Sequence, residues 1–270
     1  MIKLNKYLKT ILMGINDAMQ YRLNFMLGLI SIIFPITIQI YIWNAVYCGK
    51  ADGVVYGFSY KQMILYTLLS AIVSKFIASD GFEGEINQDI KDGGLSKFLV
   101  KPVSYSKYRL SCSIGKKTPQ IITITILLIT VLIVSSYVLE QALEPFRVIG
   151  FFISICLAIL LNLLHVYCIS AAAFWINDAG SFFHIASLVV NVFSGGVFPL
   201  EIFGSTLNHF FNYLPYKYTI YYPVIIVNGR LESYRIIEIL GVQIFWIVVL
   251  ILLSKILWKS GMKKYNAIGG

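Results

Sequence analysis

Long apolar runs constrain the fold of this chain more than any other feature. Several of them reach the roughly 20 residues that a helix needs to cross the hydrocarbon core of a bilayer. Hydrophobic residues make up 58% of the 270 residues, whereas a soluble domain is typically about 45–50% apolar. Backbone polar groups within lipid must be satisfied inside the segment, which favours helices. We therefore predict an all-α polytopic membrane protein, with residues 1–270 forming a single transmembrane domain.

The positions of the runs predict six transmembrane helices and three further elements. The spans are expected at 23–43, 62–79, 118–137, 146–175, 180–196 and 236–258, and Pro35 should kink the first. Residues 3–20 carry an apolar stripe and a basic face, which predicts an amphipathic helix in the plane of the membrane. The alternative for 3–20 is an extended cytoplasmic start to the first span. Residues 82–101 are expected to form a cytoplasmic helical region, and the proline-broken stretch 197–232 to form re-entrant helices outside.

The distribution of lysine and arginine predicts the orientation. With the N-terminus inside, fifteen of these residues fall in cytoplasmic segments and at most six outside. Basic residues stay on the cytoplasmic side during insertion, so both termini are expected in the cytoplasm. The same rule explains the net charge of +9 without a nucleic-acid partner. Lys75, near the inner end of its span, is expected to extend its amine to the interface.

We find no pattern in the sequence that predicts catalysis or metal binding. His165, His184 and His209 are far apart and form no zinc motif. Residues 115–118, Gly-Lys-Lys-Thr, resemble the end of a phosphate-binding loop, but Leu110 stands where its first glycine should be. We interpret them as a basic cytoplasmic anchor. The chain is therefore expected to bind no metal and no cofactor and to have no catalytic residues.

The charged segment between the second and third spans is the strongest functional signal. Phe82, Ile86 and Ile90 recur at helical spacing, and Gly93 is expected to end the helix in a left-handed conformation. Acidic residues occupy the rest of its surface: Glu83, Glu85, Asp89 and Asp92. Such a helix would be repelled by anionic lipid, so its carboxylates are expected to pair with basic residues of a docked protein. The alternative is a helix that covers the inner mouth of the bundle.

Other polar residues are candidates for function by their position. Asp178, in a short cytoplasmic hairpin, is either a second contact with the docked protein or a simple turn residue. Five polar side chains fall inside predicted spans: Gln39, Asn162, His165, Asn191 and Gln243. They are candidates for a translocation path or for a seam between subunits. The alternative for each is a hydrogen bond between helices of one subunit.

Three motifs resemble one family. The run from Glu85 to Tyr105, with its Glu-Ile-x-x-Asp-Ile-x-x-Gly-Gly-Leu-Ser core, resembles the coupling-helix loop of ABC-2-type transporter permeases. Residues 21–25, Tyr-Arg-Leu-Asn-Phe, are similar to the entry of the first span in a six-span subgroup. Residues 194–200, followed by Leu-Pro-Tyr at 214–216, are similar to its outer re-entrant segment. Gly204 departs from that pattern, since many relatives have a proline there.

The resemblance implies a permease subunit of an ATP-binding cassette exporter in a bacterial plasma membrane. Its implied partners are membrane lipids, a second permease that is identical or paralogous, and two cytoplasmic ATPase subunits that bind ATP and Mg. The implied cargo is amphipathic or hydrophobic: a drug, a lipid or a peptide. Contacts with the ATPase are expected at Phe82, Glu85, Ile86, Asp89, Ile90, Gly93 and Asp178, and an outer gate at Gly195, Gly196, Pro199 and Pro215. The alternatives are a membrane interaction protein that does not transport and a membrane-embedded enzyme.

Overall fold

The computed structural model of the chain is a bundle of helices. It describes residues 2–20, 22–48, 53–79, 81–99, 103–139, 144–176, 179–228 and 231–265. The α-helices are α1 (Ile2–Gln20), α2 (Arg22–Ile30), α3 (Ile33–Tyr47), α4 (Tyr60–Ile77), α5 (Phe82–Lys91), α6 (Ser96–Leu99), α7 (Tyr105–Leu139), α8 (Pro145–Ser170), α9 (Ala179–Phe193), α10 (Gly204–Phe211), α11 (Tyr221–Val227) and α12 (Ser233–Met262). Three short 3-10 helices accompany them: η1 (Ala171–Phe174), η2 (Leu200–Phe203) and η3 (Tyr216–Tyr218). The predicted all-α class is confirmed.

The described residues contain five helical segments that are long and apolar enough to cross a membrane. They are Met26–Tyr47, Tyr60–Lys91, Tyr105–Tyr137, Pro145–Phe174 and Ser233–Met262. The polytopic prediction is thereby confirmed, but the count of six is not. The expected span at 180–196 is α9, which has only 15 residues. At about 1.5 Å per residue it is about 22 Å long, shorter than a hydrocarbon core of about 30 Å.

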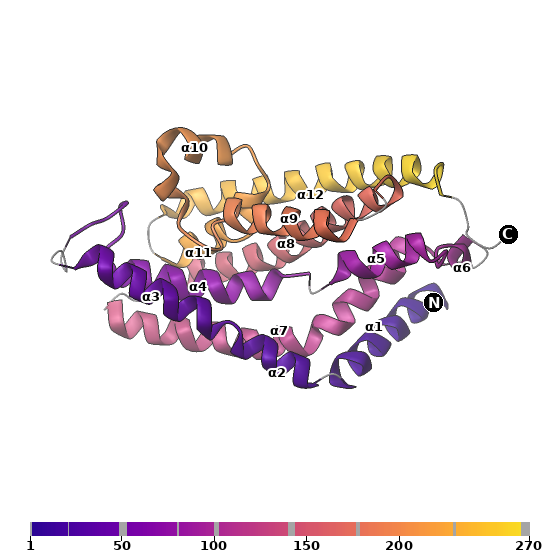
Figure 1. Cartoon of the computed structure of the whole chain (residues 1–270). Coiled ribbons are helices and arrows are strands. Elements are labelled where there is room, and N and C mark those ends of the chain that lie inside the picture. Colours follow the sequence, from indigo (N-terminus) through magenta and orange to yellow (C-terminus); the bar gives the residue numbers. More distant parts are fainter. Residues whose placement is uncertain are drawn as a thin grey trace.

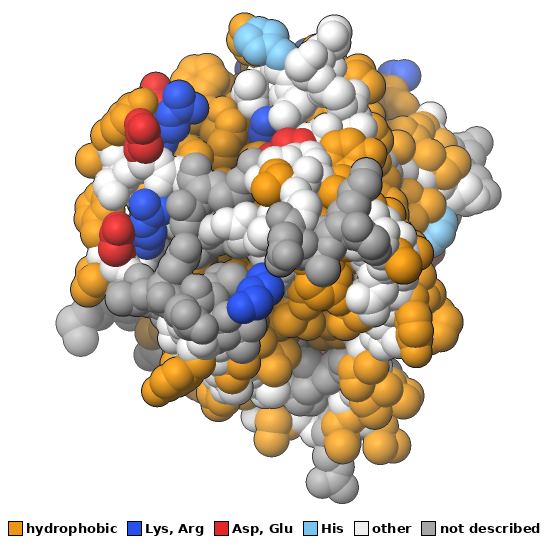
Figure 2. Space-filling model, turned by 90° about the vertical axis from the view of Figure 1, so that its left-hand side faces the viewer, with side chains coloured by type: hydrophobic (Ala, Val, Ile, Leu, Met, Phe, Trp, Pro, Cys, Tyr) orange, Lys and Arg blue, Asp and Glu red, His pale blue; other side chains and the backbone are white. Residues whose placement is uncertain are grey.

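The two ends of the bundle carry different elements. The start of α1, the end of α12, α5 and α6 lie together at one end, and α10 lies at the other (Figure 1). Both described chain ends therefore share one side, in keeping with the orientation expected from the basic residues. Figure 2 looks onto the α10 end, where charged side chains lie singly or in pairs among apolar and uncharged ones.

The first predicted span is interrupted just before Pro35. α2 ends at Ile30 and α3 begins at Ile33, with a turn at Ser31 and Ile32. Pro35 has no backbone N–H, so the carbonyl of Ser31, four residues earlier, loses its helical donor. The kink expected from Pro35 is thus present as a short interruption of the helix.

α7 differs most from its prediction. It begins at Tyr105 rather than at residue 118 and runs without interruption to Leu139. Its 35 residues extend about 52 Å at about 1.5 Å per residue, well beyond the hydrocarbon core. Pro119 lies inside it, and the helix bends along its length (Figure 1).

α1 lies against the extended first part of α7 (Figure 1). The two helices touch at Gly14 and Gly115, where a Cβ on either glycine would collide with a backbone carbonyl of the facing helix. Two glycines facing each other let the two backbones approach closely. The helix expected at 3–20 is therefore present, and its anchor within the chain is α7.

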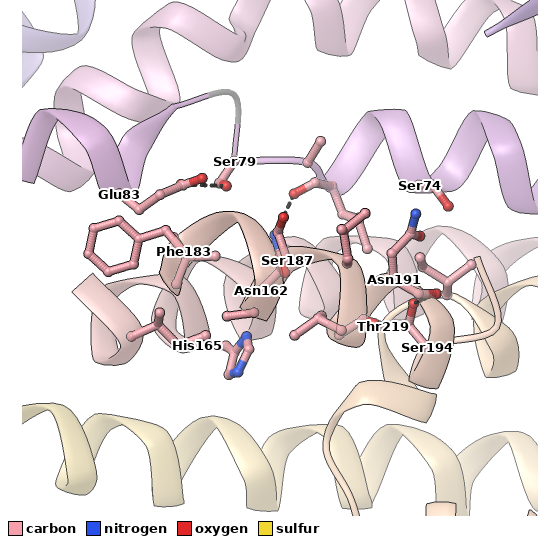
Figure 3. A pocket seen from close by; sticks show the side chains of 18 of the residues that line it. Ser74, Ser79, Glu83, Asn162, His165, Phe183, Ser187, Asn191, Ser194 and Thr219 are labelled. Atoms are coloured by element: carbon pink, nitrogen blue, oxygen red, sulfur yellow. Dashed lines mark hydrogen bonds between the residues drawn. The ribbon is translucent and has the colours of Figure 1, made fainter. Parts of the chain in front are cut away.

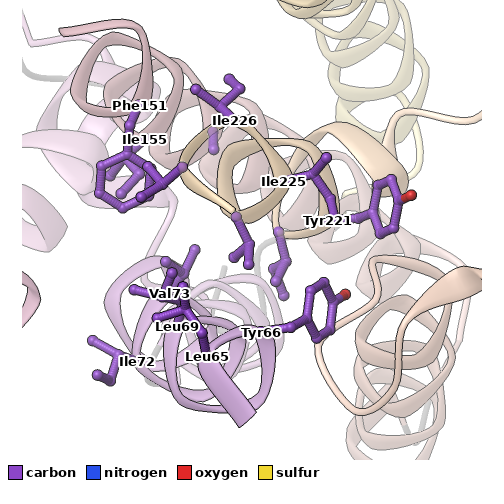
Figure 4. Close-up of a cluster of buried hydrophobic side chains, with 14 of the residues drawn as sticks. Leu65, Tyr66, Leu69, Ile72, Val73, Phe151, Ile155, Tyr221, Ile225 and Ile226 are labelled. Atoms are coloured by element: carbon purple, nitrogen blue, oxygen red, sulfur yellow. The ribbon is translucent and has the colours of Figure 1, made fainter. Parts of the chain in front are cut away.

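The main core surrounds the seven-residue α11. It packs between α4 and α8, so that Ile225 and Ile226 meet Leu69 and Phe151 (Figure 4). A helix of this length cannot span a bilayer, and it is buried on nearly all sides. The expected re-entrant region at 197–232 thus consists of short helices, of which α10 is exposed and α11 is enclosed.

The contact between α1 and α7 yields a stability prediction. Gly115→Val should weaken folding by about 1–3 kcal/mol, because its side chain would be forced into the carbonyl of Ile11. The measurement is thermal unfolding of the purified chain in detergent. Gly241→Val is the matched control, since Gly241 lies in α12 with open space around its Cβ position. Equal melting temperatures for the two variants would contradict the close contact.

Candidate coupling helix and intramembrane cavity

α5 has the geometry expected of a short helix with defined ends. Gly81 precedes it at a φ of +87°. Gly93 follows it at a φ of +72°, which confirms the left-handed conformation expected there. The backbone N–H of Leu95 donates to the carbonyl of Asp89 at 3.1 Å and tightens the exit from the helix.

The apolar line of α5 is used inside the chain. Phe82, Ile86 and Ile90 are 3%, 0% and 7% exposed. They pack with Tyr167 of α8 and Phe183 of α9 in a cluster separate from the main core. These three residues therefore hold α5 onto the bundle, and their apolar surface is not free to meet a docked protein.

The carboxylates of α5 have partners within the chain as well. Arg109 of α7 donates from Nε to Oδ2 of Asp89 at 2.6 Å and from Nη1 to Oε2 of Glu85 at 2.7 Å. Lys116 pairs with the other oxygen of Glu85, and the Tyr105 hydroxyl donates to Asp89 at 2.7 Å. Within the described chain, α7 thus supplies cations to Glu85 and Asp89, the two residues expected to pair with a docked protein.

The spacing of these partners in the sequence is itself helical. Tyr105, Arg109 and Lys116 recur at i, i+4 and i+11, which places them on one face of a helix. The periodicity places them on a helix that begins before the span predicted at 118–137, as α7 does.

The end of α4 is held by side chains of α7 and α8. Lys117 donates to the carbonyls of Ile77, at 3.2 Å, and of Ala78. Asn162 donates to the same Ile77 carbonyl at 2.7 Å, and Gln120 donates to the carbonyl of Lys75 at 3.2 Å. These bonds satisfy the last carbonyls of the helix, which have no partner within it. Residues 115–118 lie within helix α7, so they form no phosphate-binding loop.

A cavity of about 380 Å³ lies between α4, α8 and α9. One end is lined by Ser79 and Glu83, where α5 begins, and the Ser79 hydroxyl donates to Glu83 at 2.9 Å. The other end is lined by Ser194 and Thr219 (Figure 3). The cavity thus extends from the first turn of α5 to the turn that follows α9.

Three of the five polar path candidates line this cavity. Asn162 and His165 face it from α8, and Asn191 faces it from α9 (Figure 3). The other two do not line it. Gln39 is buried in α3, and Gln243 is fully buried in α12, where its Nε2 donates to the carbonyl of Tyr218 at 2.8 Å. Gln243 therefore forms a hydrogen bond within one subunit, which is the alternative given above to a place in a translocation path.

The glycine pair expected in the outer gate directly follows Ser194, which lines one end of the cavity, and neither glycine lines the cavity itself. Gly195 has a φ of +79°, and its carbonyl accepts a hydrogen bond from the Tyr66 hydroxyl at 2.7 Å. A Cβ on Gly196 would collide with Asn191 and Ser74, so glycine lets the turn approach these polar groups. Ser74 Oγ is buried there with no hydrogen-bond partner in the described structure. Pro199 and Pro215 precede η2 and η3 and do not line the cavity.

Two further expectations concern Asp178 and metal binding. Asp178 lies outside the described residues. Within the described part of the chain, no three His, Cys, Asp or Glu side chains gather in a way that could hold a metal ion.

A family model described as ABC-2 family transporter protein matches residues 33–269. The chain belongs to this family. The match covers most of the chain and confirms the resemblance drawn from the coupling-helix loop. Membership makes the protein a multi-pass permease subunit and implies partnership with an ABC ATPase. A comparison with curated proteins gives no match.

The contacts of Arg109 in the permease can be tested directly. Arg109→Gln should speed amide hydrogen exchange across α5, because Glu85 and Asp89 lose their guanidinium partner. A double-mutant cycle with Asp89→Asn should give a coupling free energy of about 0.5–3 kcal/mol from thermal unfolding. Arg147→Gln, which removes the pair with Glu144 at the start of α8, is the control and should leave exchange in α5 unchanged. Identical amide hydrogen exchange in α5 of the wild type and of the Arg109 variant would show that the Arg109 ion pairs do not hold α5 in place.

Proposed function

We propose that the chain is the permease subunit of an ABC exporter for an amphipathic or hydrophobic substrate. In this proposal it resides in a bacterial plasma membrane with both termini in the cytoplasm. It pairs with a second permease, identical or paralogous, and with two ATPase subunits that bind ATP and Mg. One observation carries the proposal within the ABC-2 family: a cavity of about 380 Å³ has the coupling helix at one end and a glycine turn at the other.

The anchoring of α5 supports a mechanical role. Arg109 ties the helix to α7, and its apolar line ties it to α8 and α9. Gln88 of α5 and Asp92, which directly follows the helix, are exposed near the end that leads to Gly93. We assign the ATPase contact to this exposed end. A push there would move the adjoining ends of α7, α8 and α9 together, because α5 is bonded or packed to each of them.

The lining of the cavity supports the substrate class. Ligand sites are typically apolar with a few well-placed polar groups. Here Ile77, Val166 and Ile220 form apolar wall, while Asn162, His165 and Asn191 bring hydrogen-bonding groups. A molecule with one apolar and one polar part would satisfy both sets. α9 leaves large apolar side chains exposed, Ile185 and Leu188 among them, which a second permease would cover in the assembled exporter.

The docking face of α5 can be separated from its anchoring face by paired variants. Gln88→Arg with Asp92→Lys should reduce co-purification of the ATPase several-fold without a change in melting temperature, since both side chains are exposed. Glu85→Lys with Asp89→Lys is the contrasting variant and should lower the melting temperature, because it places lysines against Arg109. The measurement is affinity purification from native membranes with mass spectrometry of the eluate. If no ATPase is recovered with the wild-type chain, the proposal that the chain is a subunit of an ABC exporter is contradicted.

The cavity can be tested by filling it. Ser187→Trp introduces a large side chain from α9 into the cavity, and it should abolish most substrate-stimulated ATP hydrolysis by the reconstituted complex. The probes are a lipophilic dye, a fluorescent phospholipid and a hydrophobic peptide, each compared with small inorganic ions. Ile244→Trp, on the exposed surface of α12, is the control and should retain stimulation. Stimulation by inorganic ions alone would overturn the assigned substrate class.

A further inference from the structure

A second hollow, of about 460 Å³, lies between α1, α6 and the start of α7. Three lysines line it: Lys6 and Lys9 from α1, and Lys97 from α6. It lies at the end of the bundle that carries α5 and the start of α1 (Figure 1). It shares no lining residue with the cavity between α4, α8 and α9.

The charges of the hollow select an anion. None of its described lining residues is acidic, and the ion pairs described for the chain include none of its three lysines. All three lysines are exposed. Three ammonium groups around one hollow repel one another, and an anion between them removes that repulsion. A phosphate group, with its several acceptor oxygens, fits such a set of donors.

The geometry of α1 places the hollow beside the hydrocarbon of the membrane. Leu8, Leu12 and Met19 of α1 are 52%, 60% and 62% exposed and form one stripe. A helix turns by about 100° per residue, so Lys9 lies about 60° around the helix from Leu12, and Lys6 about 60° further. If the stripe rests in the acyl region, the lysines lie at the level of the headgroups.

Part of the lining of the hollow is apolar, which favours a lipid over a soluble anion. Met13, Phe98 and Val103 line it together with the lysines. The ring of Phe98 is held in place by Tyr105 and Tyr108, with centroid distances of 5.1 and 4.9 Å. Met13 is 67% exposed. At about 100° per residue it lies about 40° around α1 from Lys9 and about 20° from Lys6, so the two lysines flank an apolar side chain.

We propose that this hollow binds the phosphate-bearing headgroup of an anionic phospholipid from the adjacent leaflet. The three lysines pair with the phosphate, and the apolar lining residues contact the start of the acyl chains. The bound lipid joins α1 to α6, which follows the coupling helix α5 after a short turn. It therefore stabilises the coupling helix against the membrane surface. The proposal depends on the membrane location of the chain and not on its cargo.

The test measures lipid binding without the ATPase. The purified chain is placed in nanodiscs of phosphatidylcholine alone or of an equimolar mixture with phosphatidylglycerol, and lipids retained after detergent extraction are quantified by mass spectrometry. The wild type should retain phosphatidylglycerol in preference to phosphatidylcholine. The variant Lys6→Gln/Lys9→Gln/Lys97→Gln should lose this preference, by about fivefold for each lysine removed, as expected for a lysine near an anionic surface.

Two control variants keep the result interpretable. Lys259→Gln/Lys263→Gln/Lys264→Gln removes the same charge from the end of α12 and should keep the preference. Replacing Lys6, Lys9 and Lys97 by arginine preserves the charges and should also keep it. Equal losses from both glutamine variants would show general charge attraction and overturn the site.

Two further outcomes would reject a lipid as the occupant. Full displacement of phosphatidylglycerol by soluble glycerol phosphate would assign the hollow to a free phosphate ester. Unchanged lipid preference in the Lys6, Lys9 and Lys97 glutamine variant, together with lost ATPase co-purification, would assign it to an acidic segment of the ATPase.

Discussion

The rotation of α5, the candidate coupling helix, about its own axis depends on one guanidinium group. Arg109 presents a planar fork of donors that reaches both Glu85 and Asp89, one helical turn apart on α5. Its side chain is only 16% exposed. Removal of the guanidinium would leave the two carboxylates, and removal of the carboxylates would leave the guanidinium, as poorly solvated unpaired charges. The apolar line of α5 alone would allow the helix to roll on α8 and α9. The ion pairs fix its rotation, and with it the place of Glu83 at the cavity.

The cavity exists because two helices end early and their ends are satisfied. α4 stops at Ile77, and its last carbonyls accept bonds from Lys117, Gln120 and Asn162. α9 stops at a glycine turn whose carbonyl is bonded to Tyr66. Backbone that leaves a helix at membrane depth is tolerated only where it is buried in protein or lines a cavity. The ends of α4 and α9 both line or adjoin the cavity, and this cavity is the candidate substrate site.

The sequence predicted what depends on local pattern. Apolar run length gave the polytopic class, the stripe of residues 3–20 gave α1, and Gly93 gave the end of α5. It failed where distant residues decide. The apolar run predicts the third span only from residue 118, whereas α7 begins at Tyr105, so Arg109 and its pairing with Glu85 and Asp89 depend on a helical extension that the apolar run does not contain. Periodicity also could not separate Asn162 from Gln243, since both are amides within apolar helices and only packing shows which one faces the cavity.

The contact between α1 and α7 gives α7 unequal arms. Counted along the axis at about 1.5 Å per residue, Gly115 is about 9 Å from Arg109 and about 36 Å from Leu139. If α7 pivots on this contact, its far end travels about four times as far as the end clamped to the coupling helix. A displacement of about 1 Å at α5 would thus become about 4 Å on the opposite side of the bundle, less what the bend at Pro119 absorbs. In such a motion, the position of Gly115 along α7 would set the ratio of the two displacements.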